Sequence, residues 1–338
     1  MAKKIVTMGE ILLRLTTPGY TKIVQARSFD AIYGGSEANV AVFLANMGMD
    51  SHFLTRLPDN EIGQSAVNFL RNYGVNTDNI IRGGERVGIY FLEKGTSVRP
   101  SKVVYDRKNS SICDINPEEV DFDVVFKDAD WFHLSGITPA LGDKCIQLVL
   151  KATEYAKKKG IPISVDLNYR NKLWAYSEFE KVMVRIIKDV DVCFGWIDEK
   201  DDKAHKIADF AKQGVDLEGF KHIFSSMKKR FNVKYVVTTL RENYSATHNA
   251  MSALIYNGEE LYQSKKYDFT IEDRVGAGDA FAAGLVYKLV NESDYKEALE
   301  FATAACVLKH TIEGDFNLCT ESEIMAITGG NTSGSVQR

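Results

Sequence analysis

Short strand-like runs alternate with longer helix-like segments from about residue 120 onward, and this alternation constrains the fold more than any other feature. Strand-like runs occupy 129–137, 161–170 and 190–196, and helical patterns occupy 141–159 and 177–188. Parallel strands require long crossovers, so the pattern predicts an α/β fold with a parallel sheet. Ligands of such sheets bind at the carboxyl ends of the strands.

Two earlier regions break this alternation. Residues 10–33 and 86–113 contain strand-like runs such as "VGIYFLEKG" and "SKVVYDR" without helices between them. They predict a small antiparallel sheet, built from two insertions, that covers a site as a lid. A hairpin is expected at 252–267, where Asn257-Gly258 separates two runs. We expect one domain over 1–328 and a disordered, Gly/Ser/Thr-rich tail at 329–338.

Composition narrows the class of partner. The 338 residues are 45% hydrophobic, and the net charge of -4 is spread along the chain. No basic face for nucleic acid or an anionic membrane is expected, so the partner is a small molecule or another subunit. Five cysteines without a CxxC pair indicate free thiols in a reducing compartment. Without a signal-peptide core or an apolar run of membrane-spanning length, we expect a cytoplasmic protein.

The segment "RVGAGDAFAAGLVYKLV" (274–290) places glycines directly before a helical pattern. Gly276 and Gly278 allow unusual backbone angles, and the first amides of a helix have no intrahelical acceptor, so the turn can bind a phosphate. An ordinary strand-to-helix turn, with Asp279 as a favourable first-turn acid, fits the same spacing. The P-loop Lys is missing, and Phe281 replaces the last glycine of a dinucleotide fingerprint.

The segment "YGGSEANVAVFLANMGM" (33–49) has a similar design. Gly34 and Gly35 precede Ser36, a good N-cap, and Gly48 ends the expected helix. Small residues let a ligand approach the backbone, and Asn39 can bind a hydroxyl group. A plain helix start is the simpler interpretation of this segment taken alone.

Together, the two segments resemble the two signature motifs of the ribokinase-like (pfkB) family of carbohydrate kinases, and the resemblance extends over nearly the whole chain. The first motif corresponds to 34–48 and the second to 273–284. Pro58 departs from the family pattern, which has glycine there, and Arg274 stands where Thr, Ser, Pro or Val is usual. The resemblance implies a three-layer α/β/α fold with a mostly parallel central sheet and a small antiparallel β lid.

Within the family, three segments resemble the 2-keto-3-deoxygluconate kinases: "VDLNYRNKLW" (165–174), "TTLRENYSA" (238–246) and "EDRVGAGD" (272–279). This implies that ATP, with Mg²⁺, phosphorylates the 6-hydroxyl of 2-keto-3-deoxygluconate. A kinase of fructose, ribose, tagatose 6-phosphate or 5-dehydro-2-deoxygluconate remains an alternative. So does a non-catalytic protein that binds a sugar or nucleotide.

The resemblance also implies roles for individual residues. Asp279 is expected to be the general base, in a turn whose anion hole is formed by Gly276, Ala277 and Gly278. Substrate binding is expected at Gly34, Gly35, Asn39, Tyr90, Tyr105, Arg107, Arg170 and Asp315. Nucleotide binding is expected at Asn168, Arg170, Thr239, Leu240, Arg241, Tyr244, Gly276 and Gly278. Glu199 is a weak, indirect metal candidate, because Trp196 replaces the Asn that usually accompanies it.

A separate physical argument favours an acidic sugar as the substrate. A carboxylate in a closed site favours arginine, which offers two parallel donors, and Arg107 and Arg170 are the candidates. A charge-assisted bond of about 1.5 to 3 kcal/mol separates an acid from a neutral sugar by roughly 10- to 150-fold. Each arginine also fits a surface ion pair. Strand alternation places Tyr105 and Arg107 on one face.

Three further points follow from the sequence. The positive end of the helix is expected to favour ionised Asp279. A lid sheet with an apolar outer face predicts a homo-oligomer. The sequence leaves open whether the galactonate epimer is used and whether a monovalent cation assists.

Overall fold

A ten-stranded central sheet organises the computed structural model, which describes residues 2–197, 214–331 and 334. Its strand order is β13-β12-β11-β10-β9-β8-β1-β4-β5, with β14 paired to β12. All pairs from β11 to β5 are parallel, and the pairs of β12 are antiparallel. The strands are β1 (Lys4–Met8), β4 (Asp50–Leu57), β5 (Ile80–Arg82), β8 (Trp131–Ser135), β9 (Ile163–Asp166), β10 (Val192–Phe194), β11 (Tyr235–Asn243), β12 (His248–Tyr256), β13 (Leu261–Gln263) and β14 (Tyr267–Thr270).

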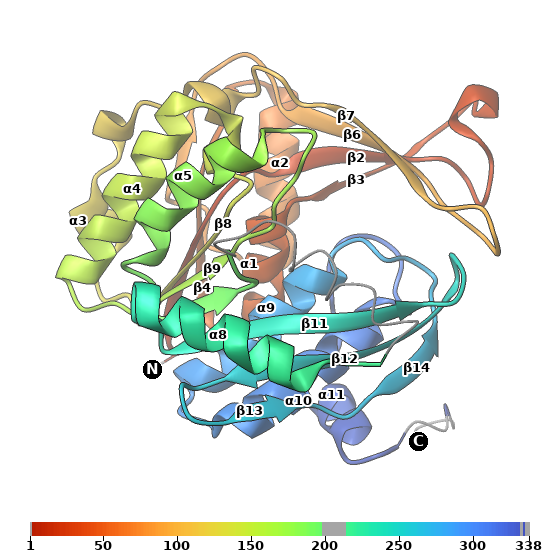
Figure 1. The fold of residues 1–338 in the computed structure, drawn as a ribbon. Coiled ribbons are helices and arrows are strands. Elements are labelled where there is room, and N and C mark those ends of the chain that lie inside the picture. Colours follow the sequence, from red (N-terminus) through yellow and green to blue (C-terminus); the bar gives the residue numbers. More distant parts are fainter. Residues whose placement is uncertain (1, 198–213, 332–333, 335–338) are drawn as a thin grey trace.

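Helices cover both faces of this sheet (Figure 1). One hydrophobic core joins the sheet to α3, α4, α5 and α8, and another joins it to α1, α9, α10 and α11. Successive strand residues serve opposite cores, as Ile5 and Val6 of β1 do. The helices are α1 (Ser36–Asn46), α2 (Glu61–Asn72), α3 (Phe122–Val125), α4 (Asp143–Lys158), α5 (Tyr176–Ile187), α8 (Leu217–Phe231), α9 (Ala277–Val290), α10 (Tyr295–Lys309) and α11 (Glu321–Thr328).

A second, small sheet has the order β3-β2-β6-β7 and extends away from the α/β body (Figure 1). Its strands are β2 (Leu12–Thr16), β3 (Asp30–Gly34), β6 (Gly88–Glu93) and β7 (Lys102–Asp106). The outer pairs are antiparallel, as expected, whereas the central pair β2–β6 is parallel. The reason is that β2 follows β1 and β6 follows β5, so both insertions leave the carboxyl ends of parallel strands.

The predicted hairpin is formed by β12 and β13, but its turn is centred one residue later than the Asn-Gly pair suggested. Tyr256 pairs with Leu261, and the Asn257 amide donates to the Glu260 carbonyl at 3.3 Å. The Asn257 side chain accepts from the amides of Glu259 and Glu260, each at 2.8 Å. This side-chain turn fixes Asn257 as the flanking residue.

Other expectations concern the thiols, the tail and the membrane. All five cysteines are free and four are buried. Within the described ranges, no helix combines the length and hydropathy that a membrane span requires. Of the predicted disordered tail, residues 332–333 and 335–338 lie outside the described residues, and so does Glu199.

Candidate active site

The Asp279 carboxylate joins the starts of two helices at the carboxyl edge of the central sheet. It lies in the first turn of α9, after Gly276, whose φ of 81° is left-handed. Its two oxygens accept hydrogen bonds from Ser36 Oγ and Asn39 Nδ2 of α1, both at 2.7 Å. The Gly35 amide donates to Asn39 Oδ1 at 3.1 Å, which orients the Asn39 amide toward Asp279. The two glycine motifs of the sequence therefore form one site.

The first turn of α9 presents free backbone donors beside this carboxylate. The amides of Gly278 and Asp279 have no acceptor among the described residues. A Cβ atom on Gly278 would meet nothing within 4 Å, so open space adjoins these amides. The Ala277 amide, also expected in the anion hole, reaches the Arg274 carbonyl at 3.4 Å. Two fully free donors at a helix N-terminus can bind an anion.

The glycines at this site are required mainly by packing between chain segments. A Cβ atom on Gly34 would overlap the Asp315 carboxylate, and one on Gly35 would overlap the Glu10 carbonyl oxygen. A Cβ atom on Gly276 would overlap the Asp315 carbonyl oxygen. We expected Gly34 and Gly35 to leave room for a ligand. In the structure, the space beside them is occupied by Asp315 and by the Glu10 backbone.

Burial, rather than the helix end, dominates the pKa of Asp279. Desolvation raises this pKa above its ordinary value, against the hydrogen bonds from Asn39 and Ser36, which lower it. The sequence predicted the opposite direction from the position of Asp279 in the first turn of α9. At Asp279, the loss of hydration outweighs the stabilisation by neighbouring hydrogen bonds.

Two further carboxyl groups, which the sequence analysis did not single out, lie at the same edge. Burial and the nearby charge of Asp279 raise the pKa of Asp166 to about 7. Burial likewise raises the pKa of Glu37 to about 7, although its Oε1 accepts from Ser135 Oγ at 2.7 Å and Thr138 Oγ1 at 2.8 Å. Asp166 is the last residue of the parallel strand β9. Because ligands bind at the carboxyl ends of such strands, this position could have identified Asp166 as a site residue from the sequence.

Asn168 and Arg170 follow β9 into the same region. Asn168 has a φ of 41°, and its Nδ2 donates to Ser36 Oγ at 3.4 Å. The charge of Arg170 lowers the pKa of both Asp166 and Asp279, so it lies within electrostatic range of each. Among the described residues, no carboxylate lies within ion-pair distance of Arg170. Arg170 Nη1 donates to the adjacent Tyr169 carbonyl at 3.3 Å, so within the described residues no carboxylate neutralises its charge.

The segment predicted as a nucleotide loop, 239–244, is instead the end of β11 and the residue after it. Thr239 and Arg241 pair with β12, and the buried Leu240 side chain belongs to a hydrophobic core. The Leu240 side chain is therefore not available to a ligand. Tyr244 is half exposed, and its hydroxyl donates to Glu242 at 2.8 Å.

Two of the predicted substrate residues belong to a buried network below the small sheet. The Tyr90 hydroxyl donates to Asp315 Oδ2 at 2.6 Å, and Arg14 Nη1 donates to Asp315 Oδ1 at the same distance. Arg14 Nη2 also bonds to Asp273. Arg14 is only 1% exposed. Its position inside the apolar strand run "LLRLT" was the only sequence signal for this network.

Tyr105 and Arg107 share one face of the small sheet, as strand alternation predicted. The Arg107 Cζ atom lies 5.5 Å from the Tyr105 ring centroid, and the rings of Tyr105 and Tyr90 are 5.8 Å apart. Arg107 is not free, because its Nε donates to Glu10 Oε2 at 2.8 Å. Ser110 also donates to the Glu10 carboxylate. Arg107 therefore forms an ion pair, which was the alternative interpretation of the sequence. The pair with Glu10 is more buried than the surface pair that was expected.

The chain is similar to known proteins over nearly its whole length. The model of the pfkB family carbohydrate kinases matches residues 2–315. The chain belongs to this family. A 2-dehydro-3-deoxygalactonokinase of Haloferax volcanii is 30% identical to this kinase over 335 residues, 99% of each chain. The crystal structure of a 2-dehydro-3-deoxygluconokinase from Thermotoga maritima has 44% identity and a TM-score of 0.90, covering 97% of this chain and 100% of that one.

More distant relatives confirm the expected ribokinase-like fold. A putative ribokinase II from E. coli, in complex with ATP and Mg²⁺, has a TM-score of 0.80 at 19% identity, covering 97% of this chain and 99% of that one. A 5-dehydro-2-deoxygluconokinase of Bacillus subtilis is 26% identical over 314 residues, 91% of this kinase and 90% of the relative. This chain is a carbohydrate kinase.

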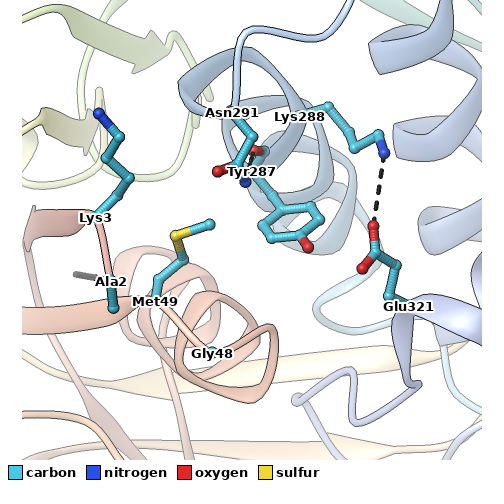
Figure 2. Close-up of a pocket in the computed structure, with 8 residues that line it drawn as sticks. All are labelled: Ala2, Lys3, Gly48, Met49, Tyr287, Lys288, Asn291 and Glu321. Atoms are coloured by element: carbon cyan, nitrogen blue, oxygen red, sulfur yellow. Dashed lines mark hydrogen bonds and ion pairs between the residues drawn. The ribbon is translucent and has the colours of Figure 1, made fainter.

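A separate hollow in the kinase lies at the far end of α9 (Figure 2). Asn291 follows the last residue of α9, whereas Asp279 lies in its first turn, so about 20 Å of helix separates them. Lys288 and Glu321 form an ion pair on one side of the hollow, with 3.6 Å between Nζ and Oε1 (Figure 2). The hollow is therefore distinct from the Asp279 site. Its lining consists of Ala2, Lys3, Gly48, Met49, Tyr287, Lys288, Asn291 and Glu321.

Proposed function

We propose that this kinase transfers the γ-phosphoryl group of ATP to the 6-hydroxyl of 2-keto-3-deoxygluconate, with Asp279 as the general base. One observation carries the proposal. Asp279, fixed by Ser36 and Asn39, lies directly beside the free amides of Gly278 and its own residue. A proton acceptor is thus adjacent to donors for phosphoryl oxygens. In-line phosphoryl transfer depends on such positioning and electrostatic stabilisation.

Each group has a distinct task in this proposal. The Asp279 carboxylate accepts the proton of the sugar hydroxyl as that oxygen bonds to phosphorus, help that is typically worth about 10² to 10⁴ in rate. The raised pKa of Asp279 makes it a stronger base than an exposed aspartate. The free amides stabilise the charge on the transferred group, because they are already oriented before the reaction.

The side chains of the described residues are compatible with a magnesium ion whose ligands come chiefly from ATP. Within the described part of the chain, no three His, Cys, Asp or Glu side chains form a group able to hold a metal. Magnesium commonly binds through phosphates and waters with few protein ligands. Asp166, whose pKa is raised by burial and by the nearby charge of Asp279, is the carboxylate that would face such a cation. The bound ion would neutralise phosphate charge.

Arg170 supports an acidic sugar as the acceptor. It has no carboxylate partner among the described residues, and it lies within electrostatic range of Asp279. A guanidinium group in that position favours a substrate carboxylate over a hydroxyl group. The two relatives at 44% and 30% identity carry names of 2-dehydro-3-deoxy sugar acid kinases, which favours this class over neutral sugars.

A coupled ADP-release assay over keto-deoxy sugar acids and neutral hexoses tests the proposal. We expect the highest kcat/KM with 2-keto-3-deoxygluconate or its galactonate epimer. A clear preference for 5-dehydro-2-deoxygluconate, fructose or ribose would contradict the substrate assignment. An absence of sugar-dependent ADP release across the panel would instead support a non-catalytic binding protein.

We also propose that the small sheet mediates a homo-oligomer. Val98, in the connection between β6 and β7, is 94% exposed, and Val104 of β7 is 44% exposed. Exposed apolar side chains on a sheet and its connecting loop are typical of an association surface. Light scattering should detect a dimer that Val104→Glu weakens, and a monomeric wild-type protein would contradict the proposal.

A further inference from the structure

Glu37, in the first turn of α1, is a buried residue to which the proposed reaction gives no task. It is 1% exposed. Its Oε1 accepts hydrogen bonds from the Ser135 amide at 3.1 Å, from Ser135 Oγ at 2.7 Å and from Thr138 Oγ1 at 2.8 Å. Ser135 is the last residue of β8, and Thr138 lies in the turn that follows. One oxygen of a helical side chain thus bonds to the carboxyl end of a central strand.

The neighbouring strand leaves space for this carboxyl group. Gly9 directly follows β1, and a Cβ atom on Gly9 would overlap the Glu37 carboxyl group. The carboxyl group therefore lies directly on the end of β1. Burial raises the pKa of Glu37 to about 7. A carboxyl oxygen accepts hydrogen bonds in the charged and the neutral form, so the contact with β8 persists in both.

The start of α1 uses its polar side chains on Asp279 instead of on its own amides. Its N-cap is Gly35, which has no side chain that could accept from the first helical amides. Ser36 and Asn39, the polar residues beside Glu37, both donate to Asp279. A helix start without a side-chain cap is less stable by about 1 kcal/mol. Glu37 supplies the anchor instead, through its bonds to β8.

Glu37 lies between the two residues that hold the base. Ser36 and Asn39 belong to the same turn of α1, and each bonds to one oxygen of Asp279. This helix packs against β1, β8 and α9 (Figure 1). A shift of its first turn would move both donors away from the Asp279 carboxylate together. The bonds that hold Glu37 on β8 therefore also determine how the base is oriented.

We infer that Glu37 is a positioning residue, which fixes the start of α1 on β1 and β8 so that the hydrogen bonds from α1 hold Asp279 in its reactive orientation. This deepens the proposed phosphoryl transfer and rests on it. The Oε1 atom of Glu37 faces Ser135 and Thr138, so Glu37 acts through its neighbours in α1.

The first test separates kcat from KM in two variants. Glu37→Ala should lower kcat by on the order of 10²-fold, because a displacement of about 1 Å misplaces the reacting groups. KM for ATP should change little, since the free amides of α9 stay in place. Glu37→Gln keeps an accepting oxygen and the size of the side chain, so it should retain most of the wild-type kcat. Unchanged kcat in Glu37→Ala would overturn the inference, and so would equal losses in the two variants.

A double-mutant cycle tests whether Glu37 acts through α1. In a variant that carries Ser36→Ala and Asn39→Ala, both bonds from α1 to Asp279 are gone. Adding Glu37→Ala to this background should then cause little further loss of kcat, because the three changes interrupt one chain of contacts. Losses that add fully would show that Glu37 acts by another route, which contradicts the positioning role.

The matched control is Glu300→Ala, which removes another glutamate that joins a helix to the central sheet. The Oε1 of Glu300, in α10, accepts from the Tyr262 hydroxyl of β13 at 2.8 Å and from the Lys265 amide at 3.0 Å. This variant should lower Tm and leave kcat unchanged. A loss of kcat as large as that of Glu37→Ala would show that general loosening is sufficient, and it would overturn the inference.

A second measurement does not depend on activity. Hydrogen exchange in the peptide 34–46 should become faster in Glu37→Ala and stay unchanged in Glu300→Ala. If Glu37→Ala does not fold, Thr138→Val, which removes one donor to Glu37 Oε1, takes its place in both measurements. A protein that lacks kinase activity but shows this local effect would refute the proposed function alone. Unchanged exchange at the start of α1 would refute the positioning role.

Discussion

At the scale of single residues, Asp279 has the most direct test. Asp279→Asn keeps the size of the side chain but removes the proton acceptor, while Ser36 and Asn39 remain in place. We expect kcat to fall by at least about 10²-fold. ATP and sugar binding, measured by calorimetry, should change little. Full activity in this variant would end the assignment of Asp279 as base.

The buried carboxyl groups of Asp166 and Glu37 predict how the stability of the protein depends on pH. The pKa of each is raised to about 7 in the folded protein. A carboxyl group with a raised folded pKa binds protons more tightly when folded, so stability increases as the pH falls toward the unfolded pKa. Between about pH 8 and pH 6, the free energy of unfolding should rise by about 1 kcal/mol for each group.

Acidification should also lower kcat/KM, because protonation of Asp279 removes the base, and burial raises the pKa of Asp279 above that of an exposed aspartate. Urea denaturation and kinetics at matched pH values measure the two trends. Asp166→Asn should remove its own share of the stability change, which makes it the internal control. Stability that decreases on acidification through this window would contradict the burial argument.

The two arginines predicted to bind the substrate should behave differently. Arg170 has no carboxylate partner among the described residues, so Arg170→Ala should weaken kcat/KM for a keto-acid by roughly 10- to 150-fold more than for a neutral sugar. Arg107 is bonded to Glu10, so Arg107→Ala should leave that buried carboxylate without its positive partner and lower Tm. Equal losses on acidic and neutral sugars for Arg170→Ala would assign it a structural role.

At the scale of elements, the starts of α1 and α9 use glycine for different reasons. Gly278→Ala should keep or slightly raise Tm, because alanine favours a helix over glycine by about 1 kcal/mol and has open space here. Its new methyl group enters the space beside the free amides, so kcat/KM for ATP should fall. Gly35→Ala, the contrasting variant, should lose roughly 1 to 3 kcal/mol of stability against the Glu10 carbonyl. Thermal melts and kinetics on both proteins distinguish these outcomes.

At the scale of the whole molecule, Arg14 fastens the small sheet to the α/β body. It bonds from β2 to Asp273 before α9 and to Asp315 after α10. Arg14→Met should lower the free energy of unfolding by about 3 to 5 kcal/mol, because it leaves two buried carboxylates without their partner. Arg86→Met, which removes an exposed pair with Asp106, is the control and should change little in urea denaturation. A similar small effect of Arg14→Met would contradict the fastening role.

Local patterns predicted much of this fold. Helices α4 and α5 and strands β8, β9 and β10 lie where hydrophobic periodicity placed them. The family resemblance assigned Thr239 to Tyr244 to a nucleotide loop, whereas pairing with β12, which a local pattern does not show, makes Thr239 to Asn243 the end of β11. The parallel pairing of β2 with β6 also depends on partners far apart in the chain.

The sequence by itself determined the α/β architecture, and it located the two glycine turns, with Asp279 in the second of them. Backbone conformation and side-chain periodicity are local properties, so a local pattern encodes them. Only the tertiary structure decided which groups meet there. It placed Asn39 against Asp279 and Arg107 on Glu10. It also reversed the expected pKa shift of Asp279. Burial and long-range charge pairing arise only when distant segments pack together, and no local pattern encodes them.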